Sequence, residues 1–128
     1  MTSTAYDIAQ YITGRFAGLS AYDPTTINGR TEGVLVEQEP NPTAYPMENY
    51  EETRVDVTVR ATGRGPRGSS RAYEEALRIY QGMKLLLDIE INGTQYDRIQ
   101  ALTSPYELYG GADYSLWKIV FNIERATE

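Results

Sequence analysis

Residues 54–87 read RVDVTVRATGRGPRGSSRAYEEALRIYQGMKLLL, and this stretch decides the fold. Polar and apolar side chains alternate over 54–60, which predicts a strand with one buried face and one solvated face. Residues 61–70 combine turn-forming residues with no apolar period, so we expect a mobile loop there. Apolar side chains then recur every three or four residues from Ala72 to Leu87, which predicts an amphipathic helix lying on the sheet.

The loop contains a pattern typical of dinucleotide-binding proteins. Its three glycines have the spacing G-x-G-x-x-G: Gly63, Gly65 and Gly68. Asp88 follows 20 residues after the last of them, as in the cofactor fingerprint. The strand before such a fingerprint belongs to a parallel sheet and is apolar on both faces, whereas residues 54–60 alternate. We therefore favour a flexible glycine loop and keep a small ligand-binding domain that uses Gly63–Gly68 as a less favoured alternative.

The composition excludes several chemistries. The chain has 128 residues, no cysteine and no histidine, which rules out disulfides, thiolate metal sites, a cysteine nucleophile and a serine–histidine triad. Asp88, Glu90 and Asn92 have the spacing that begins a calcium loop, but Ile99 occupies the twelfth position, where such a loop needs a glutamate. No carboxylate pair has the setting of a catalytic acid and base. We expect a protein that is not an enzyme and has no cofactor or metal.

Charge is distributed unevenly along the chain. Twelve Lys and Arg against eighteen Asp and Glu give a net charge of −6. The net charge is −6 over residues 1–53, +4 over residues 54–71 and −4 over residues 72–128. An acidic chain is a poor ligand for DNA, because neutralised phosphates supply most of that affinity. The arginine-rich loop leaves contact with an acidic partner open.

The chain carries neither a secretory signal nor a membrane-length segment. Its first residues lack a basic region followed by an apolar run, and no apolar stretch approaches the length needed to cross a bilayer. We expect a soluble protein without a membrane partner.

The first fifty residues predict one helix, one strand and an arm. Thr4 as N-cap with Asp7 three residues later predicts the start of a helix. The apolar run at the centre of residues 31–39 predicts a strand. Three prolines within residues 40–46 predict an extended irregular arm, because proline suits neither a helix interior nor a central strand.

The last forty residues predict a hairpin, a loop and a long strand. Asn92-Gly93 predicts a type I′ turn between two antiparallel strands, because both central positions of that turn need positive φ. A loop follows at 103–113, and 114–124 predicts a strand that is apolar on both faces at its middle. The second apolar face indicates either a subunit partner or cover by the long loops, and both alternatives stay open.

These elements define the expected fold class. We predict a single α+β domain over residues 1–128, with two helices packed on a mainly antiparallel, mixed sheet of about five strands and long irregular loops. The mobile loops are expected near 39–50, 61–70 and 103–113.

Tyrosine and arginine are the candidate contact residues. Eleven tyrosines are present, several of them in predicted loops or at element ends, and exposed Tyr with Arg is typical of protein interfaces. The alternatives are tyrosines that reach solvent from a small core, and stacking of single-stranded nucleic acid, which the net charge disfavours. The candidate interface residues are Arg60, Arg64, Arg67, Arg71, Tyr45, Tyr106, Tyr109 and Trp117.

The order of elements and several local patterns resemble the tail terminator or minor capsid (tail completion) proteins of long-tailed bacteriophages. The resemblance covers most of the chain from Thr31 onward. It rests on the alternating strand at 54–60, on Ala-x-x-Ile-Tyr-x-x-Met at 76–83, and on Pro105-Tyr106 leading through a glycine-containing loop to WKIVFNIE at 117–124.

The resemblance implies a structural virion subunit, assembled in the host cytoplasm, that forms a closed ring of usually six copies. Such a ring caps the tail tube and joins it to the head connector, and DNA only passes through its lumen, which an acidic surface would suit. The arginine-rich loop at Arg64 and Arg67 departs from the family pattern. A neck or head completion protein that binds only the connector is the alternative.

Overall fold

The computed structural model describes residues 3–26, 29, 32–40, 43–45 and 50–126. It has two helices, α1 (Thr4–Arg15) and α2 (Arg71–Met83). The strands are β1 (Ala21–Tyr22), β2 (Gly33–Gln38), β3 (Thr43–Tyr45), β4 (Tyr50–Ala61), β5 (Leu85–Ile91), β6 (Thr94–Ala101), β7 (Tyr106–Gly110) and β8 (Ser115–Ala126). The α+β class is confirmed.

All eight strands belong to one sheet, so the expectation of about five strands is wrong. The order is β1-β2-β4-β8-β6-β5, with β3 paired to β4 and β7 paired to β8. Only β1 and β2 run parallel among the described strand pairs, so the sheet is mixed and mainly antiparallel. The additional strands are short: β1 has two residues and β3 has three.

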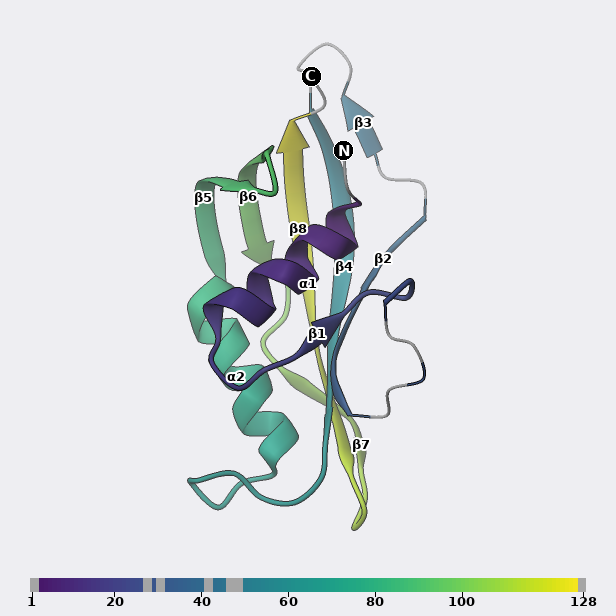
Figure 1. Cartoon of the computed structure of the whole chain (residues 1–128), viewed down its shortest axis with the longest axis vertical. Coiled ribbons are helices and arrows are strands. Elements are labelled where there is room, and N and C mark those ends of the chain that lie inside the picture. Colours follow the sequence, from purple (N-terminus) through teal and green to yellow (C-terminus); the bar gives the residue numbers. More distant parts are fainter. Residues whose placement is uncertain (1–2, 27–28, 30–31, 41–42, 46–49, 127–128) are drawn as a thin grey trace.

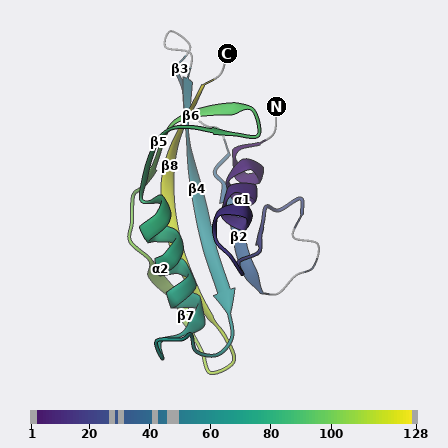
Figure 2. The ribbon, with the colours of Figure 1, turned by 60° about the vertical axis from the view of Figure 1, so that its left-hand side comes forward.

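The sheet is built around β4 and β8, each of 12 residues. They pair antiparallel over their whole length, with Val57 opposite Ile119. The predicted alternation over 54–60 is confirmed. Val55, Val57 and Val59 are fully buried, whereas Arg54, which directly precedes Val55, is exposed. Figure 2 shows both long strands curving past α2.

Both helices cover the same face of the sheet (Figure 1). Ile8 and Ile12 of α1 and Ile79 of α2 share one buried cluster with the valines of β4 and with Ile119. Burying such side chains stabilises the fold by about 1.5 to 3 kcal/mol each. The opposite face carries no helix in the described part of the chain. Neither described helix is long and apolar enough to cross a membrane.

The hairpin between β5 and β6 confirms the turn prediction. Asn92 and Gly93 have φ of 51° and 80°, as a type I′ turn requires. Two loop predictions were wrong in part, because Tyr106–Gly110 and Thr43–Tyr45 are strands. Each pairs with a long strand from its edge, a position that tolerates neighbouring prolines and exposed side chains. Mobility of the three loops stays a prediction.

The start of α1 differs from the expectation. Ser3 is the N-cap, and its side chain accepts a hydrogen bond from the N–H of Tyr6 at 3.1 Å. Asp7 is buried and accepts hydrogen bonds from Tyr96 and from Asn92 (2.9 Å) on the β5–β6 hairpin. The expected capping role of Asp7 is therefore replaced by a contact between α1 and the hairpin.

Candidate protein interface

One end of the molecule gathers most of the predicted interface residues. There the loop 61–70 and the turn between β7 and β8 lie together (Figure 1). We call this surface the Arg–Tyr end and define it by Arg60, Arg64, Arg67, Tyr106, Tyr109 and Tyr114. The guanidinium of Arg60 lies 3.8 Å from the ring centre of Tyr114, whose ring is 4.9 Å from that of Tyr109.

The sheet register explains why these side chains meet. Arg60 on β4 is opposite Leu116 on β8, and Leu116 is opposite Tyr109 on β7. The three residues therefore form one row across the helix-free face. Tyr114 immediately precedes β8 and completes the stack. Arg60 and Tyr109 are 49 positions apart in the chain, so only the sheet topology brings them together.

The glycine loop is held by an acidic side chain of α2. The carboxylate of Glu74 accepts hydrogen bonds from the N–H of Arg67 (3.2 Å to each oxygen) and of Ser69 (3.0 Å). A Cβ at Gly65 would collide with the carboxylate of Glu74, so a larger residue there would displace that side chain. Gly63 and Gly68 have φ of +76° and +87°, which favours glycine at both positions.

This geometry gives the G-x-G-x-x-G spacing a structural explanation. In a dinucleotide site the loop amides and helix N-terminus face a phosphate. Here the carboxylate of Glu74 occupies the N–H groups of Arg67 and Ser69. The strand before the loop, β4, is also antiparallel to both of its long neighbours, β2 and β8. Both features differ from the cofactor fingerprint.

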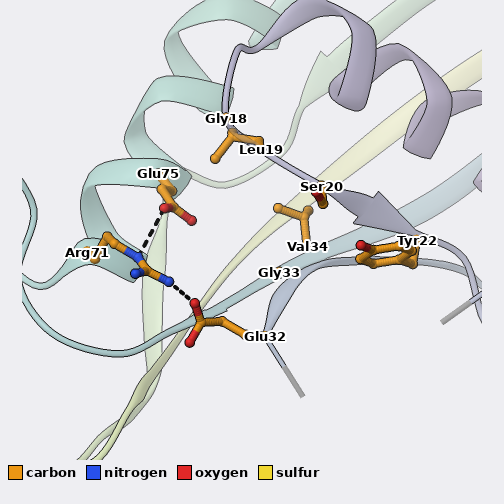
Figure 3. A pocket seen from close by; sticks show the side chains of 9 residues that line it. All are labelled: Gly18, Leu19, Ser20, Tyr22, Glu32, Gly33, Val34, Arg71 and Glu75. Carbon is orange, nitrogen blue, oxygen red and sulfur yellow. Dashed lines mark hydrogen bonds and ion pairs between the residues drawn. The ribbon is translucent and has the colours of Figure 1, made fainter. Parts of the chain in front are cut away.

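Arg71 belongs to a different surface from the rest of the predicted set. It lies between Glu32 and Glu75, with its Nε 3.3 Å from a Glu75 oxygen and a second nitrogen bonded to Glu32 (Figure 3). The hydrogen bond from Arg71 lowers the pKa of Glu32 below its usual range. Burial raises the pKa of Glu75, although Arg71 opposes this.

The three charges line a cavity of about 360 Å³ between α2 and the segments around β1 and β2 (Figure 3). Its other lining residues are Gly18, Leu19, Ser20, Tyr22, Gly33 and Val34. The charge of Arg71 neutralises one of the two carboxylates. Its ion pair with Glu32 joins α2 to the residue just before β2. Because Arg71 already has two carboxylate partners, we interpret this cluster as a clamp between elements.

Two predicted interface residues lie away from the Arg–Tyr end. Trp117 is on the helix-covered face, where its ring centre is 4.6 Å from that of Tyr73 on α2. Tyr45 is opposite Tyr50 on β3 and β4, at the other end of β4 from Arg60. The structure therefore does not bring Trp117 or Tyr45 together with the arginine loop.

The helix-free face exposes large apolar side chains, of which sequence reasoning named Tyr106 and Tyr109 but missed the leucines. Leu85 and Leu87 on β5 are 54% and 59% exposed. Among the residues that the structure describes, the other exposed large hydrophobic ones are Leu102, Tyr106, Leu108 and Tyr109. The run of three leucines at 85–87 could have indicated an exposed apolar surface. The same run is equally typical of a buried strand, and only the pairing partner distinguishes the two.

Two ion pairs lie on the same face. The ammonium of Lys118 lies 3.0 Å from the carboxylate of Asp56, and the hydrogen bond that Lys118 donates to it raises the pKa of Lys118. Arg98 is 3.8 Å from Glu124. Within each pair the two charges neutralise each other.

A buried polar cluster lies on the opposite side of the sheet. Tyr96 is fully buried, and its hydroxyl donates a hydrogen bond to Asp7. Burial raises the pKa of Tyr96 well above its ordinary value, and the bond to Asp7 adds to the shift. Arg125 and Glu51 form an ion pair of 2.5 Å at the ends of β8 and β4. Because Asp7 and Tyr96 have no exposed surface, we assign them a role in stability.

The fold and this surface define a small α+β protein with one end rich in arginine and tyrosine. Within the described residues, no three acidic side chains are placed to hold a metal ion. Neither the known protein families nor the curated proteins provide a match to this chain.

Proposed function

We propose that this chain is a tail terminator of a long-tailed bacteriophage. In this proposal it is a structural protein of the virion that forms a closed ring, caps the tail tube and joins it to the head connector. The ring assembles in the host cytoplasm, and DNA passes through its lumen without being bound. The proposal rests on the resemblance of the chain from Thr31 onward and on the surface described above.

The observation that carries the proposal is the uncovered face of the sheet. A row of half-exposed leucines and tyrosines runs from Leu87 on β5 to Tyr109 on β7. Apolar patches of this kind mark interaction sites, and Tyr and Arg are the residue types that dominate binding energy at interfaces. A subunit that assembles with copies of itself and with a tube has a use for such a surface.

The filled glycine loop favours a structural role over the ligand-binding alternative. A nucleotide phosphate would have to displace the carboxylate of Glu74 from the amides of Arg67 and Ser69. We expect no rise in melting temperature when ATP, NAD or FAD is titrated against the protein. A saturable rise would favour the ligand-binding alternative, because a ligand stabilises the state that it binds.

The assembly itself is tested by light scattering coupled to size-exclusion chromatography over a wide range of protein concentration. We expect a closed oligomer whose mass stops increasing with concentration, and rings of uniform size in negative-stain electron microscopy. A monomer at every concentration, both alone and with tail tube protein, would contradict the proposal. Binding to the connector but never to the tube would instead favour the neck protein.

A further inference from the structure

We propose that Arg67 of one copy docks against the β5–β6 hairpin of the next copy, and that Glu74 is the positioning residue for this contact. The inference rests on the proposed ring and goes beyond it by naming the two surfaces that meet. It is carried by three observations: a hydrogen-bonded loop, one cation of that loop without an ion-pair partner among the described residues, and a complementary group of acids at the other end of α2.

The loop that carries Arg67 is hydrogen-bonded to the rest of the subunit. Glu74 binds the N–H of Arg67 itself and that of Ser69. Within the loop, the N–H of Gly65 donates to the carbonyl of Ser69 at 2.8 Å, and the guanidinium of Arg64 donates to the carbonyl of Gly68 at 2.9 Å. A loop already held in one shape loses less entropy on binding, which favours a specific contact.

Arg67 is the cation that this loop offers. Arg60 stacks on Tyr114, Arg64 bonds to the loop backbone, and Arg71 bonds to carboxylates. The side chain of Arg67 is exposed and has no ion pair with any residue that the structure describes. An arginine in this position suits bidentate recognition of carboxylate oxygens.

The complementary charge lies on the β5–β6 hairpin. Asp88 and Glu90 of β5 are exposed, as is Asp97 of β6, and none of the three is ion-paired in the described part of the chain. The hairpin carries this acidic group next to the exposed Leu87. A partner surface with one arginine and apolar side chains would therefore be complementary to the hairpin in both charge and apolar area.

The two surfaces cannot meet within one subunit. The loop ends where α2 begins, at Arg71, and β5 begins at Leu85, directly after the other end of α2. The 13 residues of α2 separate them by about 20 Å at 1.5 Å per residue. The contact must therefore join the loop of one copy to the hairpin of another. Such a head-to-tail contact generates a ring when its rotation closes.

A protein partner fits this loop better than nucleic acid does. DNA affinity comes mainly from many neutralised phosphates, whereas the chain has a net charge of −6. A single fixed arginine supplies direction and specificity, which a carboxylate on a folded surface can use.

The test uses charge exchange between the two surfaces. Arg67→Glu alone and the double variant Asp88→Lys with Glu90→Lys each place like charges opposite each other. We expect each to weaken assembly about tenfold or more by sedimentation velocity. An equimolar mixture of the two proteins restores opposite charges at every contact of an alternating ring. We expect the mixture to assemble, although each protein alone does not.

Two further variants separate this contact from general effects. Arg15→Glu makes the same charge change on an exposed residue of α1, outside both proposed contact surfaces, and we expect it to assemble like the wild type. Glu74→Ala should leave the circular dichroism spectrum unchanged, speed amide hydrogen exchange at Arg67 and Ser69, and weaken assembly. Glu74→Gln keeps an acceptor and should lie between Glu74→Ala and the wild type.

The outcomes distinguish this inference from the proposed ring. If the wild type never assembles, the ring itself is wrong. If the wild type assembles and Arg67→Glu assembles equally well, the ring stands and this contact is wrong. Equal losses in Arg67→Glu and Arg15→Glu, or no rescue in the mixture, would also overturn it. Intact assembly combined with lost retention on duplex DNA would assign Arg67 to DNA.

Discussion

Replacing Tyr96 by Phe tests whether the buried hydroxyl is part of the fold's stability. The hydroxyl donates to the carboxylate of Asp7, and both residues have no exposed surface. Tyr96→Phe removes a donor from a buried carboxylate without leaving a large cavity. Leaving such a group short of one hydrogen bond costs about 1 to 3 kcal/mol. At pH 8 we expect the variant to be less stable by this amount.

The pH dependence gives a sharper test. Burial raises the pKa of Tyr96 above its ordinary value of 10.0, so the folded state keeps a proton that the unfolded chain releases. The stability from this group is therefore complete below pH 10 and is lost as the pH rises above it. One proton corresponds to about 1.4 kcal/mol per pH unit, or about 2 kcal/mol by pH 11.5.

The assay is urea denaturation followed by far-ultraviolet circular dichroism between pH 8 and pH 11.5. The other ionisable groups are present in both proteins, so we expect the free energies of unfolding of wild type and Tyr96→Phe to converge as the pH rises. Tyr109→Phe is the matched control, because it removes an exposed hydroxyl that does not contact Asp7. A difference between wild type and Tyr96→Phe that stays constant with pH would refute the reasoning.

Four substitutions test the core, the open face and two glycines, the first three by urea denaturation and Gly65→Ala by amide hydrogen exchange. Ile119→Ala should cost about 2 to 5 kcal/mol, because Ile119 is fully buried between the helices and the sheet; a cost near zero would contradict the assigned core. Leu87→Ala should change the stability of the isolated subunit by less than about 0.5 kcal/mol, since the side chain is 59% exposed. Gly93→Ala should cost about 1 to 2 kcal/mol at its positive φ. Gly65→Ala should displace Glu74 and speed amide exchange in the loop, and unchanged exchange would contradict the close approach.

Local signals predicted the central elements of the fold. The strand at 54–60 was recognisable because β4 buries every second side chain beneath the helices, and that alternation is written in the sequence. The turn at Asn92-Gly93 was recognisable because few residue pairs adopt positive φ at both positions. Both predictions depend on neighbouring residues alone.

Pairing across the chain limited the other predictions. The strands Thr43–Tyr45 and Tyr106–Gly110 exist because β4 and β8 extend beyond their main neighbours and offer free edges. All five residues of β7 are exposed, so that strand carries no alternation of burial. Asp7 was interpreted as a capping residue because its partner Tyr96 is 89 positions away.

Only part of the candidate interface could be predicted, because its contacts also depend on pairing between residues that are distant in the chain. Residue type identified Arg60 and Tyr109, and the sheet register placed them together. Residue type could not reveal that Arg71 is paired with Glu32, which is 39 positions away. Trp117 shares its face with the buried Ile119, so strand parity already indicated a position under the helices.

Electron microscopy of tail tubes that polymerise from purified tube protein, with and without this chain, tests the proposed function most directly. If the chain is a tail terminator, adding it during polymerisation produces shorter tubes that stop growing and carry a ring of density at one end. Tubes of unchanged length with bare ends, at concentrations where the chain itself assembles, would contradict the account.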